Sequence, residues 1–261
     1  MSGTISQWSV PVAVACAVAV ASLAACGDEA SAPENRTVRG PQVAVGAGMA
    51  WSEMVFDSAE ELQELSVVFT EGALSNLPAT LPNTEFIIPM PTQAPATVYN
   101  HIGINWQPNG HPPPMVYTVP HFDVHYYLVS MSARDAITPA DPAFAAKAVK
   151  APAAGEAPPS YVGDPQGVPR MGTHWSDPTS HEFHGSPFTN TMIYGFYDGR
   201  MVFIEPMMTK AFLETKPNET KALKVPAKYP APGRYPTSYR VAFDATAREY
   251  RVTLLGMQTR S

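Results

Sequence analysis

Proline is the residue that most restricts how this chain can fold. The sequence contains 28 prolines among its 261 residues, about twice the average usage of roughly 5%. Proline lacks a backbone N–H and is disfavoured in helix interiors and in central strands. The chain is therefore expected to form many short elements joined by long, stiff connections.

Short stretches rich in β-branched and aromatic residues lie between the proline-rich segments. The clearest are TMIYGFY and RMVFIEP, which flank Asp198-Gly199. An Asp-Gly pair between two such runs predicts a hairpin with a primed turn. YRVAF and EYRVTLL, within 238–258, predict a second, half-exposed antiparallel pair. Further strands are expected at 51–56, 84–88, 97–106 and 121–130.

The strand pattern decides the fold class. About seven to nine short strands are expected, with one or two short helices, of which 132–152 is the best candidate region. The sequence has no βαβ rhythm, no internal repeat and no glycine-rich phosphate loop, so no nucleotide cofactor is expected. The predicted class is mainly β, an antiparallel β-sandwich or barrel with long Pro-rich loops and one or two short helices.

The N-terminus resembles an export signal. Residues 10–25 form an apolar, alanine-rich run that is too short for a comfortable membrane span and is typical of a signal peptide. The run ends in LAAC, which resembles the bacterial lipoprotein signal in which Cys26 is acylated. Because the first eight residues carry no Lys or Arg, an ordinary cleaved secretory signal is the alternative.

These features predict three segments: a lipoprotein signal peptide at 1–25, a flexible tether at 26–50 and a single β-rich domain at 51–261. The chain is expected to be exported and anchored to the cell envelope by lipid, or secreted as a soluble protein in the alternative case. The only other cysteine, Cys16, lies in the signal, so a disulfide or a Cys-ligated zinc is not expected. With a formal charge of −6 and no basic run, nucleic acid is not an expected partner.

The histidines are concentrated in the middle of the chain. None of the seven precedes residue 101 or follows residue 184. The stretch PHFDVHYY places His121, Asp123 and His125 at alternate positions, hence on one face of a strand, and the apolar and aromatic residues between and after them are expected to face the core. Residues i and i+4 of a flat strand lie about 13 Å apart, so His121 and His125 should not both ligate one ion. Asp123 could ligate with one histidine or orient it.

The remaining ligands must come from other strands or loops. Glu205 lies in the apolar run MVFIEPMM, where a buried carboxylate would need a charged partner, a metal or a proton. The alternative is that Glu205 ends its strand before Pro206 and points into solvent. The candidate metal ligands are His121, Asp123, His125, His174, Glu182 and Glu205, with His111 and His184 as secondary candidates. Nitrogen and oxygen ligands without sulfur suit zinc, manganese, iron or nickel.

Other chemistry has weak support in the sequence. His101 and His181 are expected to be structural, because histidines near aromatic or turn residues usually hydrogen-bond to backbone or carboxylate groups. The sequence lacks a G-x-S-x-G elbow and the H-E-x-x-H pattern of zincins, since HEFHG is one residue too short. No particular reaction can therefore be assigned from motifs.

Three blocks of this sequence resemble a family of bacterial domains. They are NGHPPPMVYTVPHFDVHYYLVS, VPRMGTHWSD and GSPFTNTMIYGFYDGRMVFIEPMMTKAFL, within a similar region from about Ser66 to Pro217. The family is the TTHB-type domain of unknown function, whose members are often exported. The resemblance implies a β-rich domain and makes homo-oligomerisation plausible, and it supplies no activity. Most of the candidate ligands lie in or between these blocks.

Two hypotheses follow from the sequence. The first is a domain that binds a divalent metal or a small ligand, with or without catalysis. The second is a non-catalytic envelope lipoprotein, oligomeric or partner-binding, in which the histidines are structural. Convergence of Asp123 and His121 or His125 with His174 and Glu205 would favour the first.

Overall fold

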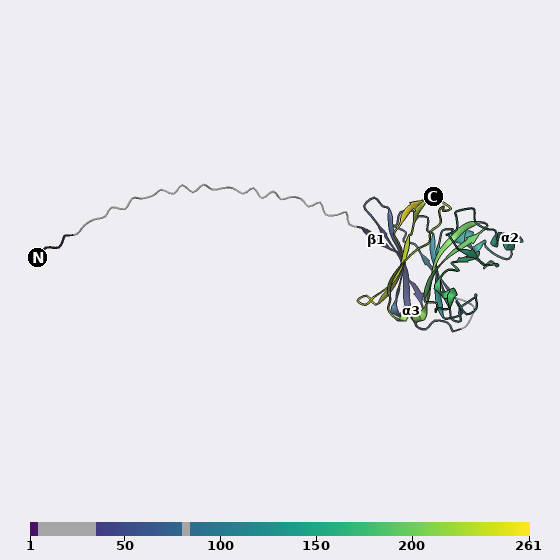
Figure 1. Cartoon of the computed structure of the whole chain (residues 1–261), viewed down its shortest axis with the longest axis horizontal. Coiled ribbons are helices and arrows are strands. Elements are labelled where there is room, and N and C mark those ends of the chain that lie inside the picture. The colour runs from purple at the N-terminus through teal and green to yellow at the C-terminus, as the bar shows by residue number, and fades with distance from the viewer. Residues whose placement is uncertain (5–34, 80–83) are drawn as a thin grey trace. The chain divides into compact units, whose positions relative to one another are not determined.

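Two antiparallel sheets contain most of the regular secondary structure in this computed structural model, which describes residues 1–4, 35–79 and 84–261 (Figure 1). Both sheets belong to the unit Pro33–Ser261. The predicted signal peptide, apart from residues 1–4, and Cys26 lie outside the described residues. No described helix is both long and apolar enough to cross a membrane.

Each large sheet has seven strands. In sheet A the order is β1 (Arg36–Arg39), β3 (Gly48–Phe56), β4 (Leu62–Thr70), β15 (Glu249–Leu255), β14 (Ser238–Asp244) and β12 (Asn218–Ala222), with β2 (Val43–Val45) paired to β3. In sheet B the order is β5 (Thr84–Pro89), β6 (His101–Gln107), β7 (His121–Tyr127), β11 (Arg200–Thr209), β10 (Asn190–Tyr197), β9 (Thr173–Ser176) and β8 (Val162–Gly163). A small third sheet pairs β13 (Gly233–Tyr235) with β16 (Gln258–Arg260).

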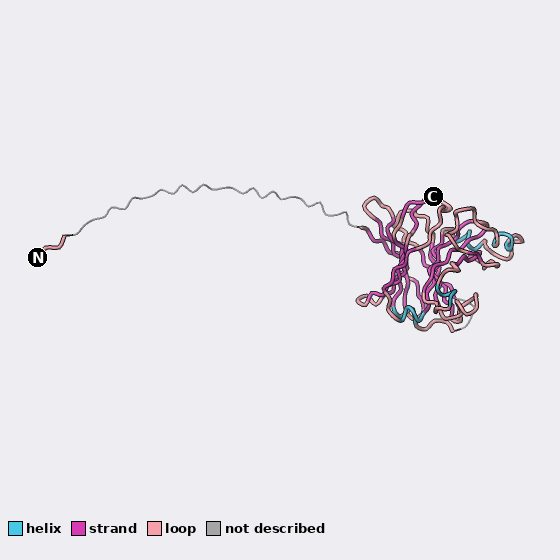
Figure 2. The backbone as a smooth tube through the Cα atoms, viewed as in Figure 1, coloured by secondary structure: helices cyan, strands magenta, loops and turns pink. Residues whose placement is uncertain are grey.

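Helices are short and peripheral (Figure 2). The described residues contain three α-helices, α1 (Met131–Asp135), α2 (Phe144–Ala148) and α3 (Lys210–Glu214). Two 3₁₀ turns, η1 (Glu71–Leu74) and η2 (His181–His184), complete the inventory. The region expected to be helical at 132–152 is divided into α1 and α2 around Pro139 and Pro142, since proline does not continue a helix.

The two large sheets share one hydrophobic core. Ile102, Phe122 and Tyr126 of sheet B belong to the same buried cluster as Val67 and Tyr250 of sheet A. The Tyr126 hydroxyl donates to the Val252 carbonyl and accepts from the Val67 N–H at 3.2 Å, so one phenol links both sheets. The predicted antiparallel β class is confirmed in its sandwich form, because the sheets do not close into a barrel.

The Asp198-Gly199 hairpin is confirmed. Strands β10 and β11 are antiparallel, with Tyr197 opposite Arg200. Asp198 has φ of 51° and Gly199 has φ of 76°. Two successive positive φ values define the primed turn, which Asp and Gly adopt readily.

The start of the domain differs from the sequence prediction. Arg36–Arg39 and Val43–Val45 pair with β3, which itself begins at Gly48. The small, polar composition of residues 36–50, interrupted by Gly and Pro, predicts a tether, and this prediction is wrong. Edge strands tolerate this composition, because only one side of each is paired.

The alternation of side chains along β7 separates the core from a second buried face. Phe122, Val124 and Tyr126 point between the sheets and belong to the shared core, as the sequence predicted. The odd-numbered residues lie on the opposite face of sheet B. That face carries the polar cluster described next.

Candidate metal-binding triads

The polar face of sheet B is buried by loops and aromatic side chains. His121 and His125 have no exposed surface, and Asp123 is 3% exposed. One small apolar cluster covers this face near His121 and a second covers it near His125. Their buried members are Tyr117, Phe188, Ile193 and Met207 for the first, and Tyr127, Ile137, Val202 and Phe203 for the second. The predicted polar strand face is therefore an interior environment.

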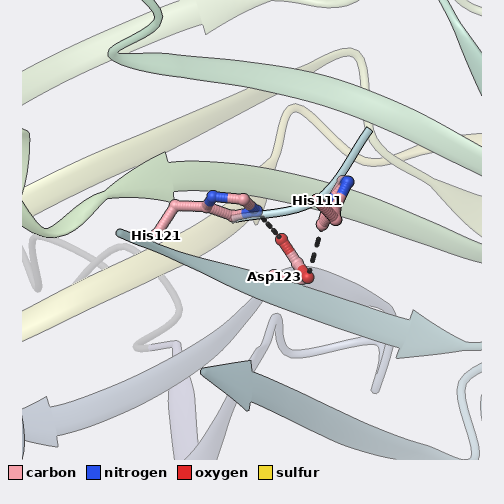
Figure 3. Close-up of side chains that lie close together, drawn as sticks. All are labelled: His111, His121 and Asp123. Atoms are coloured by element: carbon pink, nitrogen blue, oxygen red, sulfur yellow. Dashed lines mark ion pairs between the residues drawn. The ribbon is translucent and has the colours of Figure 1, made fainter. Parts of the chain in front are cut away.

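His111, His121 and Asp123 form the first group, here called the outer triad (Figure 3). His121 and Asp123 are two residues apart on β7, whereas His111 comes from the loop between β6 and β7. The His121 Nε2 atom lies 3.1 Å from Asp123 Oδ1, and the His111 Nε2 atom lies 3.7 Å from Asp123 Oδ2. Figure 3 shows the carboxylate between the two rings.

Backbone carbonyls fix the tautomers of both histidines in the outer triad. His121 Nδ1 lies 2.7 Å from the Val119 carbonyl, and His111 Nδ1 lies 2.7 Å from the Pro112 carbonyl. Because a carbonyl only accepts, each Nδ1 carries the proton. In the neutral rings, each Nε2 would then direct a lone pair toward the Asp123 carboxylate. This repulsive arrangement requires a shared cation or a proton between the groups.

The electrostatics of the outer triad favour an ionised carboxylate. Burial alone would raise the pKa of Asp123, but the adjacent His121 and His111 rings outweigh it and lower that pKa well below its usual value. Burial acts to lower the pKa of His111, but the contact with Asp123 more than compensates and raises it. Gln107 Nε2 also donates to Asp123 Oδ2 at 2.9 Å and so holds the carboxylate in place.

His125, His174 and Glu205 form the second group, here called the inner triad. They come from β7, β9 and β11. The His125 Nε2 atom lies 3.3 Å from Glu205 Oε1, and the His174 Nε2 atom lies 3.6 Å from Glu205 Oε2. Within each triad, one ligand atom per residue can be chosen so that all three lie within 4.8 Å of one another.

Gly195 makes the packing above the inner triad possible. It lies on β10 directly opposite both His174 on β9 and Phe203 on β11. A Cβ atom at position 195 would lie 2.1 Å from the Phe203 ring, which therefore needs glycine beneath it. The ring packs against His125 at 4.6 Å and His174 at 5.4 Å between centroids.

Burial dominates the electrostatics of the inner triad. It lowers the pKa of His125 to about 3 and that of His174 to about 4, so both rings are neutral near pH 7. Burial, reinforced by the negative charges of Asp123 and Asp164, raises the pKa of Glu205 well above its usual value. In the absence of a cation, this triad is thus held as two neutral imidazoles and a protonated acid.

The structure divides the predicted ligands between two groups. His125, His174 and Glu205 converge, and the alternative that Glu205 points into solvent is excluded by its 1% exposure. His121 and Asp123 converge with His111, which was only a secondary candidate. The expectation that His121 and His125 do not share one ion agrees with their placement in different triads.

Two of the candidate residues lie outside both triads. Glu182 is buried, but its nearest polar partners are the Tyr117 hydroxyl at 3.4 Å and His181 Nδ1 at 3.8 Å. His184 is exposed, and its Nε2 atom lies 3.0 Å from the Pro178 carbonyl. Neither position supports a ligand role in the described groups.

Sequence reasoning missed the polar residues of β6. Asn105 and Gln107 are buried and lie opposite Asp123 and His121 in the sheet register. The available signal was the alternation of polar residues in HIGINWQ, which places both side chains on the face that carries the triads. The strand expected at 97–106 stops one residue short of Gln107, which the structure includes in β6.

The comparisons with known proteins match one segment of the chain, which lies outside the triads. No curated protein and no solved structure matches this chain. The sequence resemblance is confirmed over a shorter segment than expected, which ends before His111 and contains no residue of either triad. Residues 57–106, which include β4, β5 and β6, match the family model TTHB210-like, described as "Hypothetical protein TTHB210".

Proposed function

We propose that this protein binds a divalent metal ion through the outer triad, His111, His121 and Asp123. The observation that carries the proposal is the fixed tautomer of both histidines, which turns each Nε2 atom toward one carboxylate. Metal-ligating histidines typically donate their other N–H to a carbonyl or carboxylate, as both do here.

The distances within the outer triad also suit a metal ion. Two ligands about 2.1 Å from a tetrahedral ion lie roughly 3.4 Å apart. The two nitrogen-to-oxygen distances at Asp123, 3.1 and 3.7 Å, bracket that value. Gln107 supplies a supporting hydrogen bond to the carboxylate.

Two histidines and one carboxylate leave coordination positions open to water or a ligand. This donor set is found with zinc and with non-haem iron, and manganese or nickel would also accept it. A bound ion of this kind acts as a Lewis acid or lowers the pKa of a bound water. The proposed function is therefore metal binding, with ligand activation as the chemistry the site could support.

Metal content should depend on His111. Full-length protein purified without an affinity tag and dialysed against Zn²⁺ is expected to retain stoichiometric metal. The His111→Ala variant should bind zinc at this site on the order of 100-fold or more weakly, and it should fold normally because His111 lies on a loop with its side chain 30% exposed. Elemental analysis and competition with a chelator would measure both.

The matched control is His184→Ala. His184 is also a histidine bonded to a proline carbonyl, but it is exposed and belongs to neither triad. This variant should bind metal like the wild type. Equal loss in both variants, or no zinc in the wild type, would contradict the proposal.

A metal-free network of histidines is the competing function of the same residues. The raised pKa of His111 and the lowered pKa of Asp123 favour an ion pair between a protonated ring and the carboxylate. Such a network would be structural, as in an oligomeric or partner-binding envelope protein. Absence of metal together with unchanged stability in chelator would support this second function.

We also propose that the chain is exported and carries lipid on Cys26. The support is the sequence LAAC after the apolar run at 10–25. In a bacterial host, Cys26→Ser should move the protein from the membrane fraction to the soluble fraction, whereas Cys16→Ser should leave it in the membrane. Mass spectrometry of the N-terminal peptide would detect the acyl chains. An unmodified Cys26 in an exported, soluble protein would favour the cleaved secretory signal instead.

A further inference from the structure

We propose that the inner triad, His125, His174 and Glu205, is a second divalent-cation site, so that one face of sheet B holds two ions. It shares no side chain with the outer triad, and its argument depends on a different observation.

That observation is a set of buried polar atoms without protein partners. Both carboxylate oxygens of Glu205 and the Nε2 atom of His125 lack a hydrogen-bond partner among the described residues. Glu205 is 1% exposed and His125 is fully buried. Buried polar groups are almost always satisfied, so unpartnered polar atoms on two adjacent, buried side chains need an explanation. A cation between them would satisfy the carboxylate and one nitrogen at once.

The geometry of the inner triad fits one ion. The Glu205 carboxylate oxygens lie 3.3 Å from His125 Nε2 and 3.6 Å from His174 Nε2. These values lie close to the roughly 3.4 Å expected between two ligands of a tetrahedral ion. Three different strands of one sheet supply the ligands, so the backbone fixes their positions before an ion arrives.

The surroundings limit access by water and leave one side open. The rings of Phe203 and Tyr127 pack against His125 at 4.6 and 5.6 Å between centroids. His174 retains 17% exposure of its side chain, so it marks the side by which an ion could enter. A water-poor shell strengthens the attraction between a cation and the carboxylate.

The two ions would influence each other. Asp123 and His125 are alternate residues of β7, so their Cα atoms lie about 6.6 Å apart. Each triad offers a single carboxylate to an ion of charge +2, so each occupied triad keeps a net positive charge. Repulsion between them predicts two binding steps rather than one. The outer triad should fill first because its His111 side chain is 30% exposed, which makes it the more accessible of the two groups.

Equilibrium dialysis of the full chain with Zn²⁺, followed by elemental analysis, tests this proposal. Wild type should bind two ions per chain. Glu205→Gln and His174→Asn should each bind one zinc ion, because each substitution should weaken zinc binding at the inner triad on the order of 100-fold. Asp123→Asn should also bind one, and His184→Ala should bind two. Glu205→Gln keeps the shape of the side chain, and circular dichroism would verify that each variant is folded.

The outcomes separate the two sites. A single ion that is lost in Asp123→Asn and kept in Glu205→Gln would overturn the second site and leave the proposed function intact. A single ion with the opposite dependence would support the inner site and overturn the outer one. No bound zinc in folded wild type would overturn both.

Discussion

Metal-free protein is expected to lose most of its stability between pH 6.5 and pH 4.5. Burial lowers the pKa values of three histidines, to about 4 for His101, about 3 for His125 and about 4 for His174. In this pH window these histidines are protonated in the unfolded chain and neutral in the folded protein. A lower pH therefore favours the unfolded state by up to roughly 1.4 kcal/mol per pH unit for each histidine.

Glu205 opposes this trend. Its raised pKa keeps it protonated in the folded protein while it ionises in the unfolded chain above about pH 4.5. Unfolding therefore releases one proton at Glu205 and takes up three at the histidines. The net uptake of about two protons corresponds to roughly 2.7 kcal/mol per pH unit. The lowered pKa of Asp123 affects stability only below this pH window, and the raised pKa of His111 affects it only above the window.

Guanidinium unfolding at several pH values, in the presence of chelator, would measure this slope. The His174→Asn variant should take up about one proton fewer than wild type on unfolding. A free energy of unfolding that stays constant from pH 6.5 to pH 5 would contradict the buried, neutral state of the histidines.

Replacing Arg134 is expected to destabilise the protein by about 3 kcal/mol or more. Arg134 on α1 is 3% exposed, and its Nη1 atom donates to Glu85 Oε1 on β5 at 3.0 Å. The guanidinium also lies over the Tyr127 ring, 5.6 Å from its centroid. Arg134→Met would leave the nearly buried Glu85 carboxylate without its interior partner, and urea denaturation would report the loss.

Arg170 provides a matched control on the same carboxylate. Its Nη1 atom donates to Glu85 Oε2 at 2.9 Å, but its side chain is 53% exposed. Arg170→Met should cost about 1 kcal/mol or less, since water screens exposed pairs. The double variant Arg134→Met/Glu85→Met should recover part of the loss, because no buried charge is left unpaired. Equal effects of the two single variants would refute this account.

Local chemistry made much of the sandwich predictable. Asp198-Gly199 specifies its own turn, and the period-two pattern of PHFDVHYY correctly placed Phe122, Val124 and Tyr126 in the core. Strands β1 and β2 were missed because they are short edge strands whose pairing with β3 is decided by the rest of the sheet. Edge strands carry a weaker pattern than strands buried on both faces.

The triads were predictable as a pool of residues but not as two groups. Strand geometry alone separated His121 from His125. The meeting of His125 with Glu205 depends on the register between β7 and β11, which are far apart in the sequence. The meeting of Asp123 with His111 depends on how the loop after β6 folds back over the sheet. Neither long-range pairing leaves a local trace in the sequence.

The position of the triads in sheet B determines how an ion would act on the whole molecule. Strands β7 and β11 lie in the middle of the sheet order, and Tyr126 on β7 also bonds to both backbone partners in sheet A. Amides of such central strands typically exchange with solvent only when the entire cooperative unit opens. An ion held there would slow hydrogen exchange throughout both sheets, whereas an ion held by peripheral loops would protect only its own surroundings.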